Sequence, residues 1–181
     1  MPVDFFRDCK KQDCKVALFG LCDDSKDGEH KPAYIDIDDS SKWIANVHNE
    51  NALCISFYAI DGCVSWRRED GKESGKCDGM LCYDNNRNVL FVELKNRTTD
   101  KKAWRSDAKD QLKDTIAYFL RFYDKATFDK IEAYICNKRH LRNQRYAQFC
   151  DNFKKDTSIT LHVTREIEVV KSLFIINYPF K

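Results

Sequence analysis

Glu93 and Lys95 lie two residues apart in the apolar segment FVELK, residues 91–95. Side chains two apart in a β-strand point to the same face of the sheet, so a strand here would hold a carboxylate and an ammonium side by side. Asp78 precedes Glu93 by roughly two strand lengths and a turn. A hairpin would therefore bring Asp78 back beside Glu93, and the sequence predicts that these three charged groups converge.

Two carboxylates and a lysine in one place are suited to metal-assisted hydrolysis. Mg²⁺ prefers carboxylate oxygens and keeps several waters, and the ligands that we expect for it are Asp78, Glu93 and the backbone carbonyl of Leu94. Such an ion lowers the pKa of a bound water and stabilises charge that develops on a phosphodiester. Lys95 would position the attacking water or stabilise the transition state. The pattern predicts a hydrolytic site that uses Mg²⁺ or Mn²⁺.

The elements that must position these residues are a hairpin and a helix. Residues 77–83 and 89–95 are rich in β-formers, and residues 84–88 between them (DNNRN) tolerate the positive φ that tight hairpins require. In residues 101–123 apolar side chains recur at three- and four-residue spacing, which predicts an amphipathic helix. Gln111 falls on this helix.

The remaining elements are marked by composition and turn residues. We expect helices over residues 41–47 and 141–153, and strands over residues 52–60, 63–67, 130–137 and, once or twice, within 158–170. This order predicts the α/β class, with a mixed central sheet that has helices packed on its faces. One domain is expected over residues 1–181, with a core of about 41–170 and an N-terminal extension, 1–40, that covers the cleft, mediates dimerisation or completes the sheet.

The chain resembles the PD-(D/E)xK nuclease superfamily. The resemblance rests on residues 77–79 (Cys-Asp-Gly) followed by residues 93–95 (Glu-Leu-Lys), and it continues to Gln111 on the next helix. It covers about residues 52–137. The resemblance implies a restriction-endonuclease-like fold for this part of the chain.

The same resemblance implies four catalytic residues, Asp78, Glu93, Lys95 and Gln111. In that family the two carboxylates bind the metal, the lysine assists the attacking water and the glutamine is an auxiliary. The family's proline before the aspartate is replaced here by Cys77. Some members add an acidic residue from their first helix, and Glu50 is the candidate for a further metal ligand.

Two groups of basic residues are candidates for contact with nucleic acid: Lys102, Arg105 and Lys109 on the predicted helix, and Lys138, Arg139, Arg142 and Arg145 after the strand 130–137. The default interpretation of the first group is a solvated helix face. The second group stands where a helix begins, a place that favours anions. We expect both to contact phosphates.

The composition limits the class of protein. The 181 residues are 43% hydrophobic and 33% charged, which is globular, and a net charge of +2 means that contact with nucleic acid must come from local clusters. Nine cysteines without a CxxC pair predict reduced thiols and a cytoplasmic protein, and Cys9, Cys14 and Cys22 with His30 match no regular zinc spacing. No apolar run is long enough to span a bilayer, so no membrane partner is expected.

The expected function is a metal-dependent endonuclease that acts on DNA, as a homodimer or with a protein partner that supplies targeting. DNA is favoured over RNA by family tendency alone. The alternative is a catalytically silent nuclease-fold module that binds nucleic acid or a protein partner. A third reading is an unrelated α/β protein with surface ion pairs, which predicts that Asp78 and Glu93 lie far apart.

Overall fold

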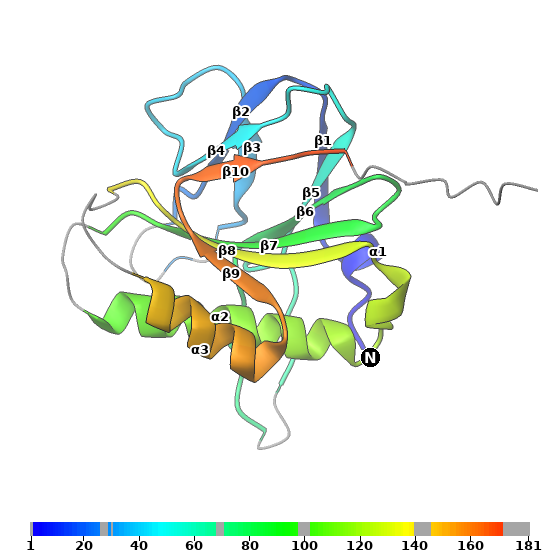
Figure 1. The fold of residues 1–181 in the computed structure, drawn as a ribbon, viewed down its shortest axis with the longest axis vertical. Coiled ribbons are helices and arrows are strands. Elements are labelled where there is room, and N and C mark those ends of the chain that lie inside the picture. The colour runs from blue at the N-terminus through cyan, green and yellow to red at the C-terminus, as the bar shows by residue number, and fades with distance from the viewer. Residues whose placement is uncertain are drawn as a thin grey trace, which may run out of the picture.

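A computed structural model describes residues 2–25, 29, 31–67, 71–97, 102–139 and 146–171, and its larger sheet has six strands in the order β1-β5-β6-β7-β8-β9 (Figure 1). These strands are β1 (Lys10–Cys14), β5 (Ile55–Ala59), β6 (Gly79–Tyr83), β7 (Asn88–Lys95), β8 (Lys130–Asn137) and β9 (Thr160–Val163). The first four pair antiparallel in turn, whereas β7, β8 and β9 run parallel. The predicted mixed sheet is therefore confirmed.

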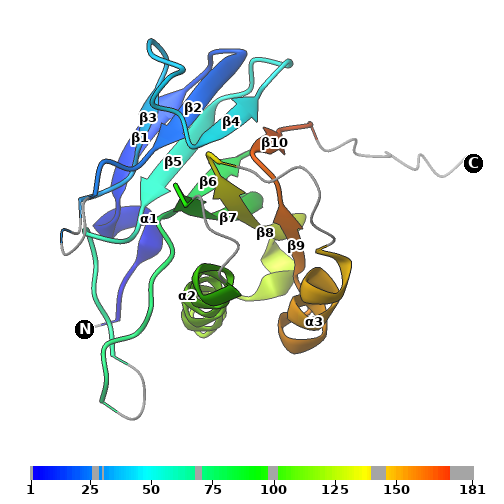
Figure 2. The ribbon, with the colours of Figure 1, turned by 90° about the vertical axis from the view of Figure 1, so that its left-hand side faces the viewer.

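Two helices connect the parallel strands. α2 (Lys102–Leu120) lies between β7 and β8, and α3 (Ala147–Thr157) lies between β8 and β9. Both crossovers step in the same direction along the sheet, so both helices cover the same face (Figure 2). α2 buries Ala108, Leu112 and Ile116 against this face, which is the apolar stripe that the spacing predicted. Shorter turns of helix are α1 (Phe5–Asp8) and η1 (Lys125–Thr127).

A second sheet covers the other face of the first. It has four strands in the order β10-β4-β2-β3, with bounds β2 (Leu18–Cys22), β3 (Tyr34–Asp36), β4 (Ala45–His48) and β10 (Glu166–Glu168). β10 pairs parallel with β4 and the other two pairs are antiparallel. The α/β class is confirmed, but helices cover one face of the central sheet rather than both.

β7 shows how the sheet is buried on both sides. Val89 and Phe91 pack toward the helices, whereas Leu90, Val92 and Leu94 pack toward the second sheet. Because neither face meets water, this strand is a nearly continuous apolar run rather than an alternating one. A charged side chain within such a strand needs a specific role or partner.

Two predicted elements are wrong. Residues 41–47 form no helix: they make a turn and then enter β4, whose buried Ala45 and Val47 alternate with half-buried neighbours. The periodicity there is two, and pairing with β2 and β10 decides it. Residues 63–67 form no strand and have one isolated bridge, from Arg67 to Glu73. The helix predicted over 141–153 is described as α3 from Ala147, and residues 141–145 lie outside the described part.

Residues 1–40 contribute to both sheets. β1 pairs with β5 at the edge of the six-stranded sheet, and β2 and β3 belong to the second sheet. Phe5 of α1 is fully buried among the residues that pack under α2. Of the three roles considered for this segment, completion of the sheet is the one that these strands perform.

The nine cysteines are free thiols, and six of them are buried. Cys9 packs on the helix side of the central sheet and Cys14 on the opposite side, so the two belong to different cores. His30, weighed with them as a zinc ligand, lies outside the described residues. Among the helices of the described part, none is long and apolar enough to cross a membrane.

Candidate active site

The hairpin of β6 and β7 places the carboxylates of Asp78 and Glu93 opposite each other. Gly79 pairs with Val92, so the next position along the hairpin places Asp78 opposite Glu93. The neighbours in this row are Ile60, whose amide donates to the carbonyl of Asp78 at 2.9 Å, and Ile135, which is in register with Glu93. Both isoleucines are fully buried. The two carboxylates therefore share the helix-covered face, between apolar side chains.

The turn of this hairpin is built by its own sequence. Asp84, Asn85 and Asn86 all have positive φ, at 51°, 56° and 61°. Asn and Asp adopt this conformation more readily than other residues that carry a Cβ. The turn fixes the strand register, and the register brings Asp78 to Glu93, as predicted.

Lys95 lies beside Glu93 and reaches α2. Its Nζ forms an ion pair with Glu93 Oε1 and lies 3.3 Å from Gln111 Oε1, to which it donates. Gln111 Nε2 in turn donates to the main-chain oxygen of Lys76 at 3.0 Å. Asp78 Oδ2 accepts the amide of Leu94, the residue between Glu93 and Lys95, at 2.6 Å. The structure thus brings together Asp78, Glu93, Lys95 and Gln111, the four residues of the predicted site.

Both carboxyl groups resist ionisation. Burial raises the pKa of Asp78 to about 7, although Lys95 and the amide of Leu94 act to lower it. Burial raises the pKa of Glu93 well above its usual range, the charge of Asp78 adds to this rise, and Lys95 opposes it. Asp78 keeps part of its surface exposed, whereas Glu93 has none. We therefore expect the larger rise of pKa at Glu93.

The pKa of Lys95 is raised as well. Burial alone would lower it, but the charges of Glu93 and Asp78 outweigh burial and raise it. The positive charge of Lys95 thus faces two carboxyl groups. If both carboxyl groups were ionised, the buried site would carry a net negative charge. A second cation at this point would lower the free energy of the ionised form.

The oxygens of Glu93 fit such a cation. The side chain is fully buried. Its Oε1 is paired with the ammonium of Lys95, whereas Oε2 has no hydrogen-bond partner within the described residues. A residue in a strand directs its N–H and C=O to the same side, and the N–H of Leu94 points to Asp78. The carbonyl of Leu94 therefore also faces Asp78, in a position consistent with its predicted role.

The acidic side chains of the described residues do not form a cluster of three or more metal ligands. Among the described residues there is no group of three or more His, Cys, Asp or Glu side chains placed to hold a metal ion. Two carboxylates and one carbonyl can still hold Mg²⁺, because this ion retains several of its waters.

Glu50 is not part of this arrangement. It is exposed in the turn that follows β4 and precedes β5. The first residues of β5 pair with the end of β6, next to the hairpin turn. Asp78 lies beside the opposite end of β5, where Ile60 donates to its carbonyl. The structure therefore does not bring Glu50 to the site.

Two carboxylates that the sequence did not single out act on the site instead. The charge of Asp61 raises the pKa of both Asp78 and Glu93, and the charge of Asp23 raises the pKa of Asp78 and Lys95. Asp61 lies two residues after β5, and Asp23 directly follows β2 of the second sheet. The sequence signal for both is their position directly after an apolar run.

The predicted basic residues divide into two groups. Arg105 lies over the rings of Trp104 and Tyr146, 5.9 and 5.5 Å from their centroids, and Lys109 lies 5.9 Å from the ring of Phe149. These two cations cover the junction of α2 and α3. They are half-buried rather than part of a fully solvated helix face.

The other group lies closer to the candidate site. The amide of Lys138 donates to the carbonyl of Lys95 at 2.9 Å, and its ammonium contacts the carbonyl of Ser41. Arg139 follows and is exposed. The backbone of Lys102 begins α2, and Arg142 and Arg145 lie outside the described residues.

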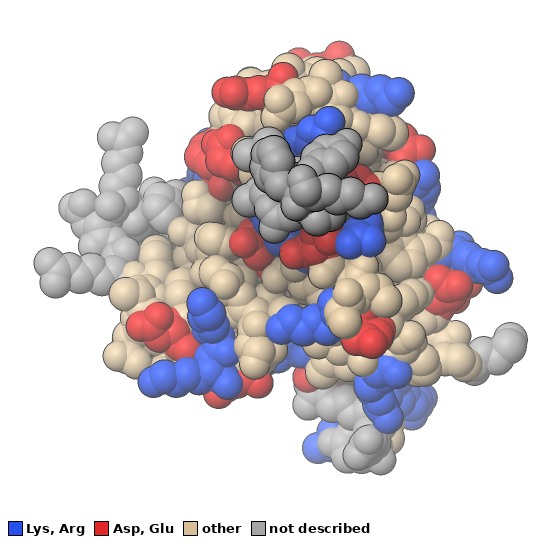
Figure 3. Space-filling model, turned by 45° about the vertical axis from the view of Figure 1, so that its right-hand side comes forward, with Lys and Arg blue, Asp and Glu red and all other residues tan. Residues whose placement is uncertain are grey.

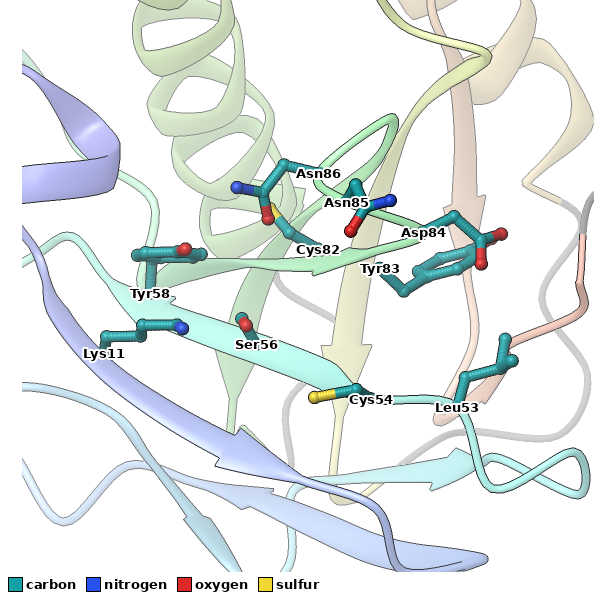
Figure 4. Close-up of a pocket in the computed structure, with 10 residues that line it drawn as sticks. All are labelled: Lys11, Leu53, Cys54, Ser56, Tyr58, Cys82, Tyr83, Asp84, Asn85 and Asn86. Atoms are coloured by element: carbon teal, nitrogen blue, oxygen red, sulfur yellow. The ribbon is translucent and has the colours of Figure 1, made fainter.

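The opposite end of the hairpin has a pocket with a different character. It lies between β1, β5 and the hairpin turn, where Lys11, Ser56 and Asn86 are among the lining residues (Figure 4). Lys11 pairs with Asp13 at 3.0 Å, and Ser56 donates to the same carboxylate at 2.6 Å. The cation of this pocket, Lys11, is thus already paired. On the face in Figure 3, basic and acidic side chains are interspersed around the grey atoms and form no surface of a single sign.

Comparison of the chain with protein-family models, with curated proteins and with solved structures gives no match. The candidate site therefore rests on its geometry. That geometry differs from the third reading of the sequence, in which these residues form surface ion pairs, because Asp78 and Glu93 lie opposite each other and Glu93 is fully buried.

Proposed function

We propose that this protein is a metal-dependent nuclease that hydrolyses phosphodiester bonds of DNA. The observation that carries the proposal is the fully buried carboxylate of Glu93, whose Oε1 is paired with Lys95 and whose Oε2 has no hydrogen-bond partner within the described residues. Such a group is costly to bury unless a further partner binds it. A divalent cation shared with Asp78 is the partner that fits its charge and its oxygen atoms.

The fold that we propose for residues 52–137 is restriction-endonuclease-like. Its support is the succession of three antiparallel strands, a helix and a parallel strand, with Asp78 immediately before β6 and Glu93 and Lys95 at the end of β7. This is the order in which the resemblance places its catalytic residues.

The roles follow from the contacts. Asp78, Glu93 and the carbonyl of Leu94 would hold Mg²⁺ or Mn²⁺, which when bound would acidify a water and stabilise charge on the phosphate. Lys95, held between Glu93 and Gln111, would orient that water. Gln111 keeps the ammonium in place because its other end is bound to the main chain of Lys76.

DNA would approach along the edge where β7 and β8 end. Lys138 and Arg139 follow β8 directly beside Lys95. Cations near a phosphodiester backbone supply affinity without sequence preference. We therefore expect cleavage with weak sequence preference unless a protein partner supplies targeting.

The test compares cleavage of linear and circular DNA by the wild type, Glu93→Gln and Lys95→Met, with Mg²⁺ or Mn²⁺ and with EDTA. Lys130→Met is the matched control, because Lys130 stands at the start of β8, at the opposite end of the parallel pair from Lys95. Circular dichroism and thermal melting check that each variant is folded.

We expect cleavage that needs the metal, is lost in both site variants and persists in Lys130→Met. Cleavage that survives Glu93→Gln would point to a contaminating nuclease and reject the site. A folded wild type that binds DNA without cutting it would instead support the silent nuclease-fold module.

A further inference from the structure

Asp61 lies in the turn two residues after β5 and directly follows Ile60, which is in the same row as the two carboxylates. Its neighbour Ile60 donates its amide to the carbonyl of Asp78 at 2.9 Å. The side chain of Asp61 is only 22% exposed. Its charge acts on Asp78 and also on Glu93, one strand further away. Asp61 is therefore electrostatically part of the site, although it belongs to another strand and another turn.

Lys76 connects Asp61 to the catalytic residues. Its Nζ lies 4.0 Å from Asp61 Oδ1 and 2.8 Å from Glu73 Oε1, and its side chain is only 9% exposed. The main-chain oxygen of the same lysine accepts the hydrogen bond from Gln111 that holds the glutamine toward Lys95. One residue thus orients the auxiliary glutamine through its backbone and borders Asp61 through its side chain.

A hollow opens at this point. Asp61, Lys76 and Glu73 are among the residues that line a pocket of about 320 Å³, which borders the site on the side of Asp61 and is lined by neither Asp78 nor Glu93. A cation bound at Asp78 and Glu93 would keep several waters, and those waters need acceptors. Asp61 offers carboxylate oxygens on the side of the site that β5 supplies.

We propose that Asp61 is a third carboxylate of the metal site and holds the cation through its bound waters. This inference rests on the proposed function. Two observations carry it. The fully buried Oε2 of Glu93 has no hydrogen-bond partner within the described residues and marks the position of the cation. Asp61 directly follows Ile60, whose amide is bonded to the carbonyl of Asp78. Contact through water agrees with the lack of a three-residue metal cage in the described part of the chain.

Binding of Mn²⁺ to the full chain, measured by isothermal titration calorimetry, tests the proposal. Asp61→Asn keeps the shape of the side chain and removes its charge, and it should weaken Mn²⁺ binding about 10-fold or more, as loss of an outer-shell ligand does. Glu73→Gln is the matched control. It makes the same chemical change in the same pocket, but Glu73 is 69% exposed and water screens its charge. We expect it to alter the dissociation constant by less than about twofold.

Glu93→Gln separates the two proposals. If Mn²⁺ binding is lost in Glu93→Gln and weakened in Asp61→Asn but not in Glu73→Gln, both proposals are supported. If Glu93→Gln loses binding while Asp61→Asn binds like Glu73→Gln, Asp61 has no role and the proposed metal site stands. If the wild type binds no Mn²⁺, the metal site and the role of Asp61 both fail. Thermal melting in EDTA confirms that the Asn and Gln variants remain folded.

Discussion

Replacement of Asp78 by Asn should stabilise the metal-free protein at alkaline pH. Burial raises the pKa of Asp78 from 3.8 to about 7. The folded chain therefore binds more protons than the unfolded chain between these values, and the free energy of unfolding falls as pH rises through this window. Asn carries no charge and still offers an oxygen to the amide of Leu94, so the variant lacks this loss.

The magnitude follows from the difference in pKa. At about 1.4 kcal/mol for each pKa unit, the rise from 3.8 to about 7 corresponds to about 4 kcal/mol. Asp78 retains some exposed surface, and water reduces the cost of its charge. We therefore expect the stability of Asp78→Asn relative to wild type to increase by about 2 to 4 kcal/mol between pH 4 and pH 8.

Urea denaturation in EDTA at a series of pH values measures this difference. Asp107→Asn is the control, because Asp107 is exposed on α2 and its replacement should change stability by less than about 0.5 kcal/mol at any pH. A difference between Asp78→Asn and wild type that stays constant with pH would refute the reasoning. So would a variant that is less stable than wild type at pH 8.

Four further results are expected. Mn²⁺ affinity should fall as the pH is lowered from 7.5 to about 6, because protons compete for Asp78, whose pKa is about 7; calorimetry at each pH would show it, and a constant affinity would contradict it. Gln111→Ala should lower the cleavage rate about 10-fold or more by releasing Lys95, with Mn²⁺ affinity nearly unchanged; an unaltered rate would remove Gln111 from the site. Phe5→Ala should cost about 3 to 5 kcal/mol in urea denaturation, and a loss under about 1 kcal/mol would show that the N-terminal segment is dispensable to the core. Gly20→Ala should lower the melting temperature, since a Cβ there would lie 1.9 Å from Cγ of Trp43; an unchanged melting temperature would mean that the indole moves freely.

The hairpin and α2 could be predicted because their signals are local. Residues 84–88 carry side chains suited to the positive φ of the turn, and the apolar spacing in α2 repeats over several turns. Once the hairpin exists, its register places Asp78 beside Glu93 and points Lys95 to the same face. The candidate site is thus largely a consequence of one supersecondary unit, and that is why its residues could be identified from the sequence.

Tertiary structure decided what lies around this unit. β4 is short, and its pairing with β10 joins segments about 120 residues apart, so no local pattern distinguished residues 45–48 from a helix. β1 likewise pairs with β5 across a distance in sequence at which spacing carries no information. The groups that reach the site from outside the hairpin, Gln111 of α2 beside Lys95 and the charge of Asp61 after β5, depend on how these elements pack. Local side-chain chemistry therefore determined the hairpin with its carboxylates, whereas long-range strand pairing and helix packing decided how deeply they are buried and which charges surround them.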